Sequence, residues 1–552
     1  MNNTAESNVS NTVPLQGVQK MGVLLMGIFL VILSGGRFVT PAAAFLAPLF
    51  LLRFTRNTSA RTGLSILFVL LFLSLMVRLH DYFAVARPLS LLFIAGFALL
   101  EVLPFLVDRK LYKKLPRFLR PFVLPCVYVA LGFTVTSFFP FGSMGERAYS
   151  QVGNSELMQL LSTTGVYGLT FVIFWFAAVM AAFWDAGFVW RRCRSQVLPL
   201  SLVLMIVFVS GGFRNIFEDN DSPTVRIAGV VSDQIALMDN LQSAGVDGGL
   251  AALAAGGYTE SDVQEILTQH HDELFEMSAT MAGAGAAIVV WAEADGVVLQ
   301  ADEEALIQRA SQVAQGNSIY LVAALAVVAE QVSDEQAPVE NKLVILGPTG
   351  EQLGQHTKAR LLWNQPYKSS DQKAPLVLDT PYGKLAFAIG FDLDFPADIR
   401  HARDADIIIA PSSDWRTLSP HHSLMATFRG VENGASVFRP TSDGVSIASD
   451  SHGRILARTD HFTTTAHTLI ADVPTGGVDT FYSVAGDWFA WAAIGLLAAM
   501  LIAATVASKR ERDRLDLEEV DRSQVAGARD RSRITAIQWR EAERDNNLQD
   551  DI

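Results

Sequence analysis

Three positions in the second half of the chain lie at or near the ends of predicted strands, where residues could carry chemistry. Glu293 ends a predicted buried strand, 287–293, and the carboxyl ends of strands are where α/β folds hold their sites. Lys358 closes a predicted hairpin about 65 residues later, and a further strand runs into Gly390-Phe391-Asp392. Each residue alone is typical of an ordinary loop, so their order and spacing carry the hypothesis.

The elements that must position these residues form an α/β pattern between 214 and 484. Short apolar strands alternate with amphipathic helical stretches, and turn residues at 347–350 favour a hairpin. The Gly/Ala-rich segment 243–257 is expected to be an insertion loop. The expected strands are 225–231, 287–293, 319–328, 342–346, 352–358, 385–391, 406–410, 437–449 and 455–458, and the expected helices are 261–282, 303–314 and 422–434.

Composition divides the chain into parts that suit different solvents. Half of the 552 residues are hydrophobic, the mean hydropathy is +0.28 and the net charge is −13. Residues 1–213 hold 17 basic and 7 acidic side chains, whereas residues 214–487 hold 16 and 37. The hydropathy is too high for a soluble globule or a disordered chain. The acidic middle part argues against nucleic acid as a partner, and two cysteines exclude a disulfide framework and a cysteine-rich metal site.

Eight apolar runs have the length or the composition of membrane-spanning helices. The second of them is short and begins at Pro41. The first follows a polar stretch and shows no cleavage site, so we interpret it as a retained helix rather than a signal peptide. The runs are 21–36, 40–53, 62–79, 88–107, 118–138, 163–185, 196–213 and 485–507.

The distribution of basic residues predicts the orientation. The loops after the second, fourth and sixth runs hold most of the Lys and Arg, and alternate loops hold few. Basic loops stay in the cytoplasm, so we expect a cytoplasmic N-terminus (1–20), a membrane domain of about seven helices (21–213) and an extracytoplasmic domain (214–484). A closing transmembrane helix (485–507) and a charged cytoplasmic tail (508–552), a solvated helix or a disordered segment, complete the prediction.

The order and spacing of these motifs resemble the apolipoprotein N-acyltransferases, membrane members of the nitrilase superfamily. The resemblance covers nearly the whole chain and implies a multi-spanning helical membrane domain with an extracytoplasmic nitrilase-like αββα domain. It implies a bacterial inner-membrane location. The matching segments are 149–151, 165–171, Val290-Trp291-Ala292-Glu293, 357–362, Ser413-Asp414-Trp415, the His421-His422 helix with Arg429 and Glu432, and 439–444.

In that family a Glu–Lys–Cys triad transfers an acyl chain from a phospholipid, through a thioester, to the N-terminus of a lipoprotein. The resemblance implies Glu293 as the base, Lys358 as the oxyanion partner and Gly390 at the position of the nucleophile. Phospholipid and a lipoprotein N-terminus are the implied partners. We expect Trp291, Trp415 and Arg439 at the substrate-binding site, and neither a metal nor a cofactor, because the adjacent His421 and His422 point apart on a helix.

The chain departs from the family pattern at the third member of the triad. Gly390 stands where the family has its cysteine, and Cys126 and Cys193 both precede the α/β domain. A second family Glu falls on Pro366, and a family Pro before the base falls on Ala292. A thioester therefore has no thiol on which to form.

Three hypotheses follow from this departure. The protein is a degenerate member that keeps the scaffold for binding lipid or a lipoprotein, or for regulating an active relative. Alternatively, it is an enzyme without a cysteine, in which Asp392, Ser412 or Ser413 is the nucleophile, or Glu293 and Lys358 promote direct attack on a bound ester or amide. A third hypothesis is a structural protein of the cell envelope with no link to acyl transfer.

Overall fold

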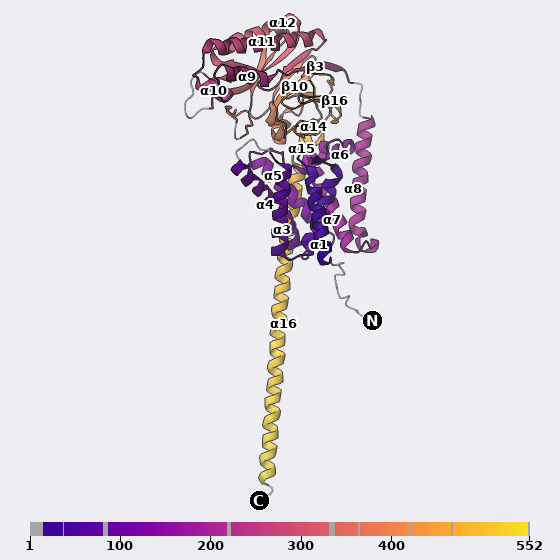
Figure 1. Cartoon of the computed structure of the whole chain (residues 1–552). Coiled ribbons are helices and arrows are strands. Elements are labelled where there is room, and N and C mark those ends of the chain that lie inside the picture. Colours follow the sequence, from indigo (N-terminus) through magenta and orange to yellow (C-terminus); the bar gives the residue numbers. More distant parts are fainter. Residues whose placement is uncertain are drawn as a thin grey trace.

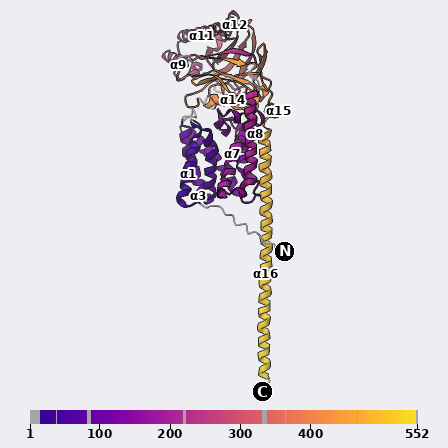
Figure 2. The same ribbon diagram turned by 90° about the vertical axis from the view of Figure 1, so that its right-hand side faces the viewer.

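The computed structural model of the full chain describes residues 15–36, 38–80, 87–217, 222–329, 337–362, 365–419, 421–464 and 467–549. A bundle of helices forms one part, an α/β domain sits on one end of the bundle, and the last helix runs back along the bundle (Figure 1). The turned view shows the same helical bundle and α/β domain, and the long final helix, α16, continuing past the bundle (Figure 2). Most of the predicted N-terminal segment 1–20 lies outside the described residues.

Every predicted apolar run is helical. Among the described residues, six helices are long and apolar enough to cross a membrane, and α1 is a shorter apolar helix. The short run that begins at Pro41 forms α2, with the proline in the first turn, where its missing N–H breaks no helical hydrogen bond. The helices are α1 (Gly17–Ile32), α2 (Pro41–Arg56), α3 (Ala60–Arg78), α4 (Arg87–Leu111), α5 (Val123–Phe138), α6 (Ser155–Met158), α7 (Leu161–Asp185), α8 (Trp190–Phe217) and α16 (Trp488–Gln549).

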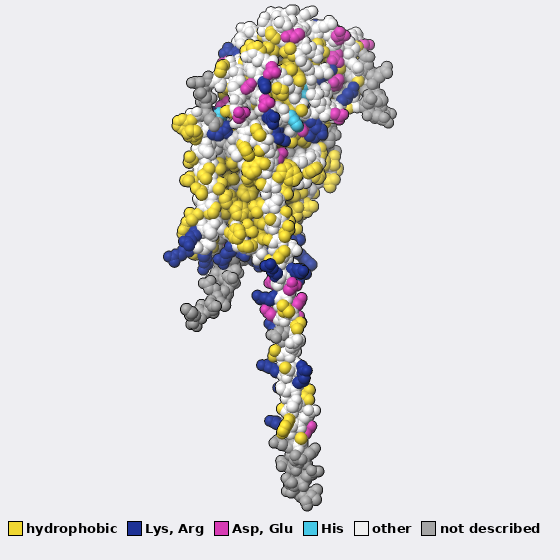
Figure 3. Space-filling model, turned by 180° about the vertical axis from the view of Figure 1, so that it is seen from behind, with side chains coloured by type: hydrophobic (Ala, Val, Ile, Leu, Met, Phe, Trp, Pro, Cys, Tyr) yellow, Lys and Arg dark blue, Asp and Glu magenta, His cyan; other side chains and the backbone are white. Residues whose placement is uncertain are grey.

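The surface of the helical part has a broad apolar band. Hydrophobic side chains cover its sides, and Lys and Arg gather at the end of the band farther from the α/β domain (Figure 3). Leu92, Leu99 and Val209 are among the large hydrophobic side chains left exposed. An exposed apolar band of this size suits a lipid environment rather than water.

Two basic residues that the sequence placed in a loop lie instead in the last turn of α2. Arg53 is fully buried and forms an ion pair with Asp185 of α7. Arg56 Nη2 lies 2.8 Å from Asp108 Oδ1 of α4. The two arginines therefore join three helices instead of facing solvent, because a buried cation needs a partner.

Helix α7 is the central helix of the bundle and is interrupted near its start. Gly165 has φ 62° and ψ −168°, which splits the helix into two segments. The N–H of Val166, at the start of the second segment, donates to Glu432 Oε1 of the α/β domain (3.0 Å). A carboxylate at a helix start satisfies a free N–H and matches the helix dipole, so the domain caps the central helix of the bundle.

In the described residues the α/β domain contains two large sheets and one short two-stranded sheet, which pairs β12 (Ser412–Ser413) with β14 (Thr441–Ser442). One sheet has the order β17-β3-β4-β6-β7-β8, with β5 also paired to β6, and the other has the order β16-β15-β13-β11-β10-β9. The strands of the first sheet are β3 (Thr224–Val230), β4 (Ile288–Trp291), β5 (Gly296–Leu299), β6 (Tyr320–Val328), β7 (Val339–Leu346), β8 (Gln352–Thr357) and β17 (Leu469–Pro474). Those of the second are β9 (Leu376–Thr380), β10 (Gly383–Phe387), β11 (Ile407–Ile409), β13 (Ser436–Arg439), β15 (Val445–Ser449) and β16 (Ile455–Asp460).

The two sheets pack face to face between layers of helices. Their shared core holds buried side chains of both sheets, such as Ile227 and Val289 from one and Phe387 and Phe438 from the other. Helices α11 (Glu260–Gly283) and α12 (Glu303–Asn317) cover the first sheet, and α14 (His421–Asn433) covers the second. The result is an α–β–β–α sandwich, as the sequence predicts. At the centre of each sheet the strands are parallel (β3-β4-β6 and β10-β11-β13), so the carboxyl ends of β4 and β10 are positioned as sites.

Several local predictions are wrong. The strand expected at 385–391 ends at Phe387, and Gly390–Asp394 forms a 3₁₀ turn, η4. The single strand expected at 437–449 is β13 and β15 with the short β14 (Thr441–Ser442) between them. The expected loop 243–257 contains α10 (Leu250–Ala255), which buries Leu253. The edge strands β9 and β17 and the short β5 were not predicted. Strands β9 and β17 are half-exposed and the buried β5 has only four residues, so none of them forms a long apolar run.

The break in α7 leads to a testable prediction. A Cβ on Gly165 would lie 2.5 Å from a ring carbon of Tyr482, in a backbone region that only glycine occupies readily. Gly165→Ala should lower the free energy of unfolding by about 1–3 kcal/mol, measured by thermal unfolding in detergent. Gly96→Ala is the matched control, because nothing lies within 4 Å of a Cβ at Gly96. Equal stability of the two variants would contradict the prediction.

Candidate functional site

Glu293 lies in the loop directly after β4 and is 2% exposed. Its Oε1 accepts hydrogen bonds from Lys358 Nζ and from Asn341 Nδ2 (2.8 Å). Its Oε2 accepts the backbone N–H of Ser413 (3.0 Å). The carboxylate is thus buried with a cation and two further donors, which is the condition under which a buried charge is tolerated.

Lys358 follows β8 and is 1% exposed. Its backbone N–H donates to the Asn341 carbonyl oxygen (2.9 Å), so β7 and β8 fix where the side chain starts. Its Nζ lies 5.5 Å from the centre of the Tyr367 ring. Burial, together with the negative charge of Glu293, raises the pKa of Tyr367 above its ordinary value. The phenol therefore stays neutral beside the ion pair.

Gly390 begins η4, the turn after β10, and has φ +45°. Its N–H donates to the Pro411 carbonyl oxygen (2.9 Å). A Cβ at this position would lie 2.3 Å from Glu293 Oε2. The structure therefore brings Glu293, Lys358 and Gly390 together, with the carboxylate in the space that a side chain at 390 would enter.

Two of the alternative nucleophiles are engaged in other contacts. Asp392 Oδ1 accepts the N–H of Arg360 (2.8 Å) and its Oδ2 accepts the N–H of Ile389 (3.0 Å). The Ser412 hydroxyl is buried and donates to the Ala410 carbonyl oxygen (3.0 Å). The third candidate, Ser413, contacts Glu293 through its backbone N–H, and its side chain is half-buried. Through these two backbone hydrogen bonds, Asp392 links the η4 turn to the loop that follows Lys358.

The three residues expected to bind substrate lie in different surroundings. Trp291 is fully buried, and its indole N–H donates to Ser278 Oγ of α11 (2.9 Å), so we leave it out of the candidate site. Arg439 is also buried, paired with Asp414 (2.9 Å). Trp415 packs in a small apolar group with Leu362, Phe391 and Phe395, next to η4. Of the three, only Trp415 lies beside the turn that starts at Gly390.

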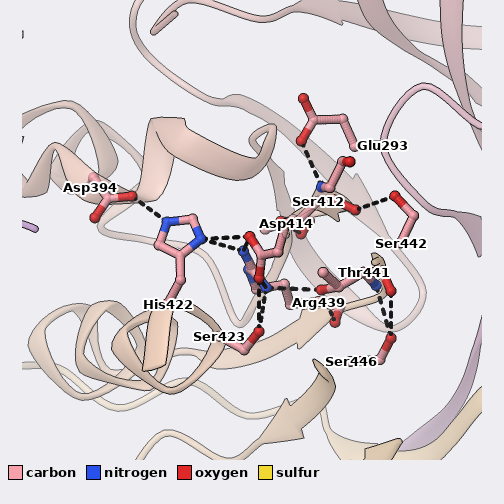
Figure 4. A network of polar contacts seen from close by, with 12 residues as sticks. Glu293, Asp394, Ser412, Asp414, His422, Ser423, Arg439, Thr441, Ser442 and Ser446 are labelled. Carbon is pink, nitrogen blue, oxygen red and sulfur yellow. Dashed lines mark hydrogen bonds and ion pairs between the residues drawn. The ribbon is translucent and has the colours of Figure 1, made fainter. Parts of the chain in front are cut away.

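A second buried network lies next to the first and centres on His422 of α14 (Figure 4). His422 Nε2 lies 2.6 Å from Asp394 Oδ2, and its Nδ1 lies 2.7 Å from Asp414 Oδ1. Burial alone would lower the pKa of His422, but the two carboxylates outweigh it and raise the pKa to about 9. Burial would raise the pKa of Asp414, but Arg439 and His422 hold it well below its ordinary value.

Sequence reasoning missed this network. It treated the His421-His422 helix as a segment of the family pattern and considered the two rings as metal ligands, without a role for His422 in hydrogen bonding. Among the described residues no group of three His, Cys, Asp or Glu is arranged to hold a metal ion. The partners of His422 are 28 and 8 residues away in the sequence. Only the positions of Asp394, four residues after Gly390, and of Asp414, next to Ser413, hinted at a link to the site.

The two cysteines lie outside this domain. Cys126 is buried in α5 and Cys193 is buried in α8. Both helices belong to the helical part, so neither thiol is part of the Glu293–Lys358 group.

Comparison with known proteins relates both parts of the chain to lipoprotein acylation enzymes. Residues 22–179 match the family model of the apolipoprotein N-acyltransferase N-terminal domain. An apolipoprotein N-acyltransferase of Geobacter metallireducens is 25% identical over 418 residues, which cover 70% of this chain and 74% of the relative. The chain is thus similar to apolipoprotein N-acyltransferases.

Solved structures of amidases are more distant. A mutant amidase from Nesterenkonia sp. AN1, with an acetamide moiety added covalently at its active-site cysteine, shares 17% identity. That match covers 49% of this chain and 97% of the amidase, with a TM-score of 0.36. A crystal structure of an amidase from Nesterenkonia sp. shares 18% identity over 47% of this chain and 92% of its own, with a TM-score of 0.35.

The Glu293–Lys358 pair leads to a stability prediction. Lys358→Met leaves Glu293 buried without its cation and should lower the free energy of unfolding by about 3–5 kcal/mol. Adding Glu293→Gln to that variant should restore most of the loss, because no uncompensated charge then remains. Thermal unfolding of the full chain in detergent measures both. If the double variant were less stable than Lys358→Met, an uncompensated charge on Glu293 would not be the cause of the stability loss in Lys358→Met.

The His422 network predicts a dependence of stability on pH. The pKa of His422 is raised on folding, so its contribution is fully present below about 6.5 and is lost as the pH rises through about 9. The full contribution is about 3 kcal/mol. His422→Gln should remove this alkaline loss from the unfolding profile between pH 6 and 10. His461→Gln is the control, because that histidine is also paired with an aspartate, Asp443 (3.3 Å). An unchanged alkaline loss in His422→Gln would contradict the assignment.

Proposed function

We propose that the protein is a membrane protein related to the apolipoprotein N-acyltransferases that binds lipid and a lipoprotein N-terminus without forming a thioester. The observation that carries the proposal is at Gly390. This residue follows β10 beside the Glu293–Lys358 pair, at the position where the family resemblance calls for a cysteine, and it has no side chain. Loss of the nucleophile removes the acyl-enzyme route altogether.

The arrangement of the ion pair supports this reading. In an acyl-transfer site the base needs to face a thiol. Here Glu293 Oε2 accepts a backbone N–H of Ser413, and the carboxylate lies against the Gly390 backbone. The Lys358 ammonium is neutralised by the same carboxylate. The charges of Glu293 and Lys358 thus compensate each other. Such a pair is stable in a site that forms no covalent intermediate.

A cavity in the helical part supports lipid binding. It has a volume of about 100 Å³ and lies between α3, α4, α5 and the loop 139–154. Its wall is apolar along Leu75, Phe97 and Phe141, whereas Arg78 and the half-buried ion pair of Arg147 with Glu101 bring charge to it. An apolar wall beside arginines suits one part of a lipid, where an apolar segment meets a phosphate headgroup. His421, the neighbour of His422, also lines the cavity.

The topology belongs to the same proposal. We assign 1–20 and 508–552 to the cytoplasm, 21–213 and 485–507 to the membrane, and 214–484 to the extracytoplasmic side of a bacterial inner membrane. The basic rim at the end of the apolar band supports this orientation (Figure 3). The cationic surface includes exposed Lys110 in the last turn of α4 and Lys113 and Arg117 after that helix, together with Arg191 and Arg192 in the first turn of α8.

A second function rests on the retained base and lysine. Glu293 and Lys358 could promote direct attack of an amine on a bound ester, with Ser413 adjacent as an alternative nucleophile. The amine would lose its proton to Glu293 as the C–N bond forms, and Lys358 would stabilise the oxyanion of the tetrahedral intermediate. The C–O bond of the ester would then break, and the protonated Glu293 would return its proton to the leaving oxygen, so that an alcohol departs. The burial of both groups, at 1–2% exposure, favours the binding function over this route.

One experiment separates the two functions. The purified full chain is incubated with phospholipid and a diacylated lipopeptide, and N-acylated peptide is sought by mass spectrometry. We expect no product from the natural chain and retention of phospholipid through purification. Arg147→Ala should reduce the retained lipid several-fold, because it removes one of the two arginines that line the cavity. Arg191→Ala, which changes an exposed arginine at the opposite end of the bundle, should not.

The outcomes are distinct. A product that vanishes in Glu293→Gln would show turnover without a cysteine and overturn the binding function. Absence of both product and retained lipid would favour a structural role in the envelope. Gly390→Cys asks whether the remaining site is intact, and N-acylated product from that variant alone would show that the missing thiol is the sole barrier to turnover.

A further inference from the structure

Two loops hold the Glu293 carboxylate between them. On one side is η4, whose first residue, Gly390, faces Glu293 Oε2. On the other side is the segment 412–414, whose Ser413 N–H donates to the same oxygen (3.0 Å). The position of Oε2 therefore depends on the separation of these loops, which come from different strands, β10 and β11.

His422 connects the two loops through one ring. Its Nε2 donates to Asp394, the last residue of η4, and its Nδ1 donates to Asp414, which adjoins Ser413. Both nitrogens can donate only when the ring is an imidazolium. The ring, Asp394 and Asp414 are all buried, so each of these charge-assisted contacts is strong and short.

The surroundings hold this ring in place from several elements. Arg439 of β13 lies against Asp414 (2.9 Å) and near His422 Nδ1 (2.9 Å), and donates to Ser423 Oγ (2.6 Å). The helical part holds the other end, because the N–H of Ser143 donates to the Asp394 carbonyl oxygen (2.7 Å). The charged groups facing the ring are therefore Asp394, Asp414 and Arg439, with His421 beside it on α14.

From this geometry we infer that His422 is a positioning residue, which ties η4 to the 412–414 segment and thereby keeps the Glu293 carboxylate against residue 390. The inference rests on the proposed function in one respect only, the assignment of Glu293, Lys358 and Gly390 as the former reaction centre. It adds a residue that contacts none of these three groups and acts on them through Asp394 and Asp414. A purely structural histidine would hold the fold without setting where Oε2 lies.

A thiol placed at residue 390 reports the position of Glu293. In the full-length Gly390→Cys variant, a carboxylate beside the thiol disfavours the thiolate and raises the thiol pKa. The ultraviolet absorbance of the thiolate, titrated against the natural chain to subtract Cys126 and Cys193, gives this pKa whether or not reagents reach the site. Gly390→Cys with Glu293→Gln should lower it by about one unit or more.

Adding His422→Gln to Gly390→Cys should also lower the thiol pKa, toward the value found with Glu293→Gln, because the carboxylate is no longer held. The sign is diagnostic. Loss of the imidazolium charge by itself would raise the thiol pKa, since a nearby cation favours the thiolate. Asp394→Asn is the second variant, in case His422→Gln does not fold, and it should shift the pKa in the same downward direction.

His461→Gln in the Gly390→Cys chain is the matched control and should leave the thiol pKa unchanged. A thiol pKa that rises or stays constant in both His422→Gln and Asp394→Asn, while Glu293→Gln lowers it, would overturn the positioning role and leave the reaction-centre assignment standing. If Glu293→Gln also left the pKa unchanged, Glu293 would not lie beside residue 390, and both the assignment and the inference would fail. None of these results depends on whether the protein binds lipid.

Discussion

The buried ion pair between Glu293 and Lys358 is the constraint on which the α/β domain depends. A carboxylate that is 2% exposed must be matched by donors, and the sandwich supplies them from separate elements. Lys358 follows β8, Asn341 comes from β7, and the Ser413 N–H follows β11. Each of these elements must stay in register for the charge to remain compensated. The ion pair therefore ties the loops of both sheets together at one point.

The same pair explains why the absence of a side chain at Gly390 is tolerated. With no Cβ at 390, the carboxylate occupies the space beside the backbone, and the positive φ of that residue suits glycine. Neighbouring groups such as Asp392, with its backbone partners, are buried and engaged in hydrogen bonds that serve the fold. The site is thus a folded polar core.

The domain and the helical part are joined by polar contacts at buried positions. Glu432 caps the second segment of α7 at Val166, and the N–H of Ser143 reaches the backbone of Asp394 in the turn that starts at Gly390. Hydrogen bonds in a low-dielectric interior are costly to break and strongly directional. The cavity beside Arg147 and the His422 network are neighbours at this interface. His421 lines the cavity, and the next residue, His422, forms the network. The cavity and the groups around Glu293 therefore share supporting elements.

The sequence by itself determined the apolar helices, the central strands and the order of Glu293, Lys358 and Gly390, because long apolar runs and strong periodicity need only local information. It also determined that no thiol accompanies the domain. It could not place short strands such as β9 and β17. It also extended the strand of β10 through Gly390 to residue 391, where the structure has the η4 turn. The pairing of His422 with Asp394 and Asp414, the core position of Trp291 and the contact of Glu293 with the Gly390 backbone were decided by the tertiary structure. Side-chain hydrogen bonds and close approaches depend on which distant loops meet, and that is settled only when the two sheets pack.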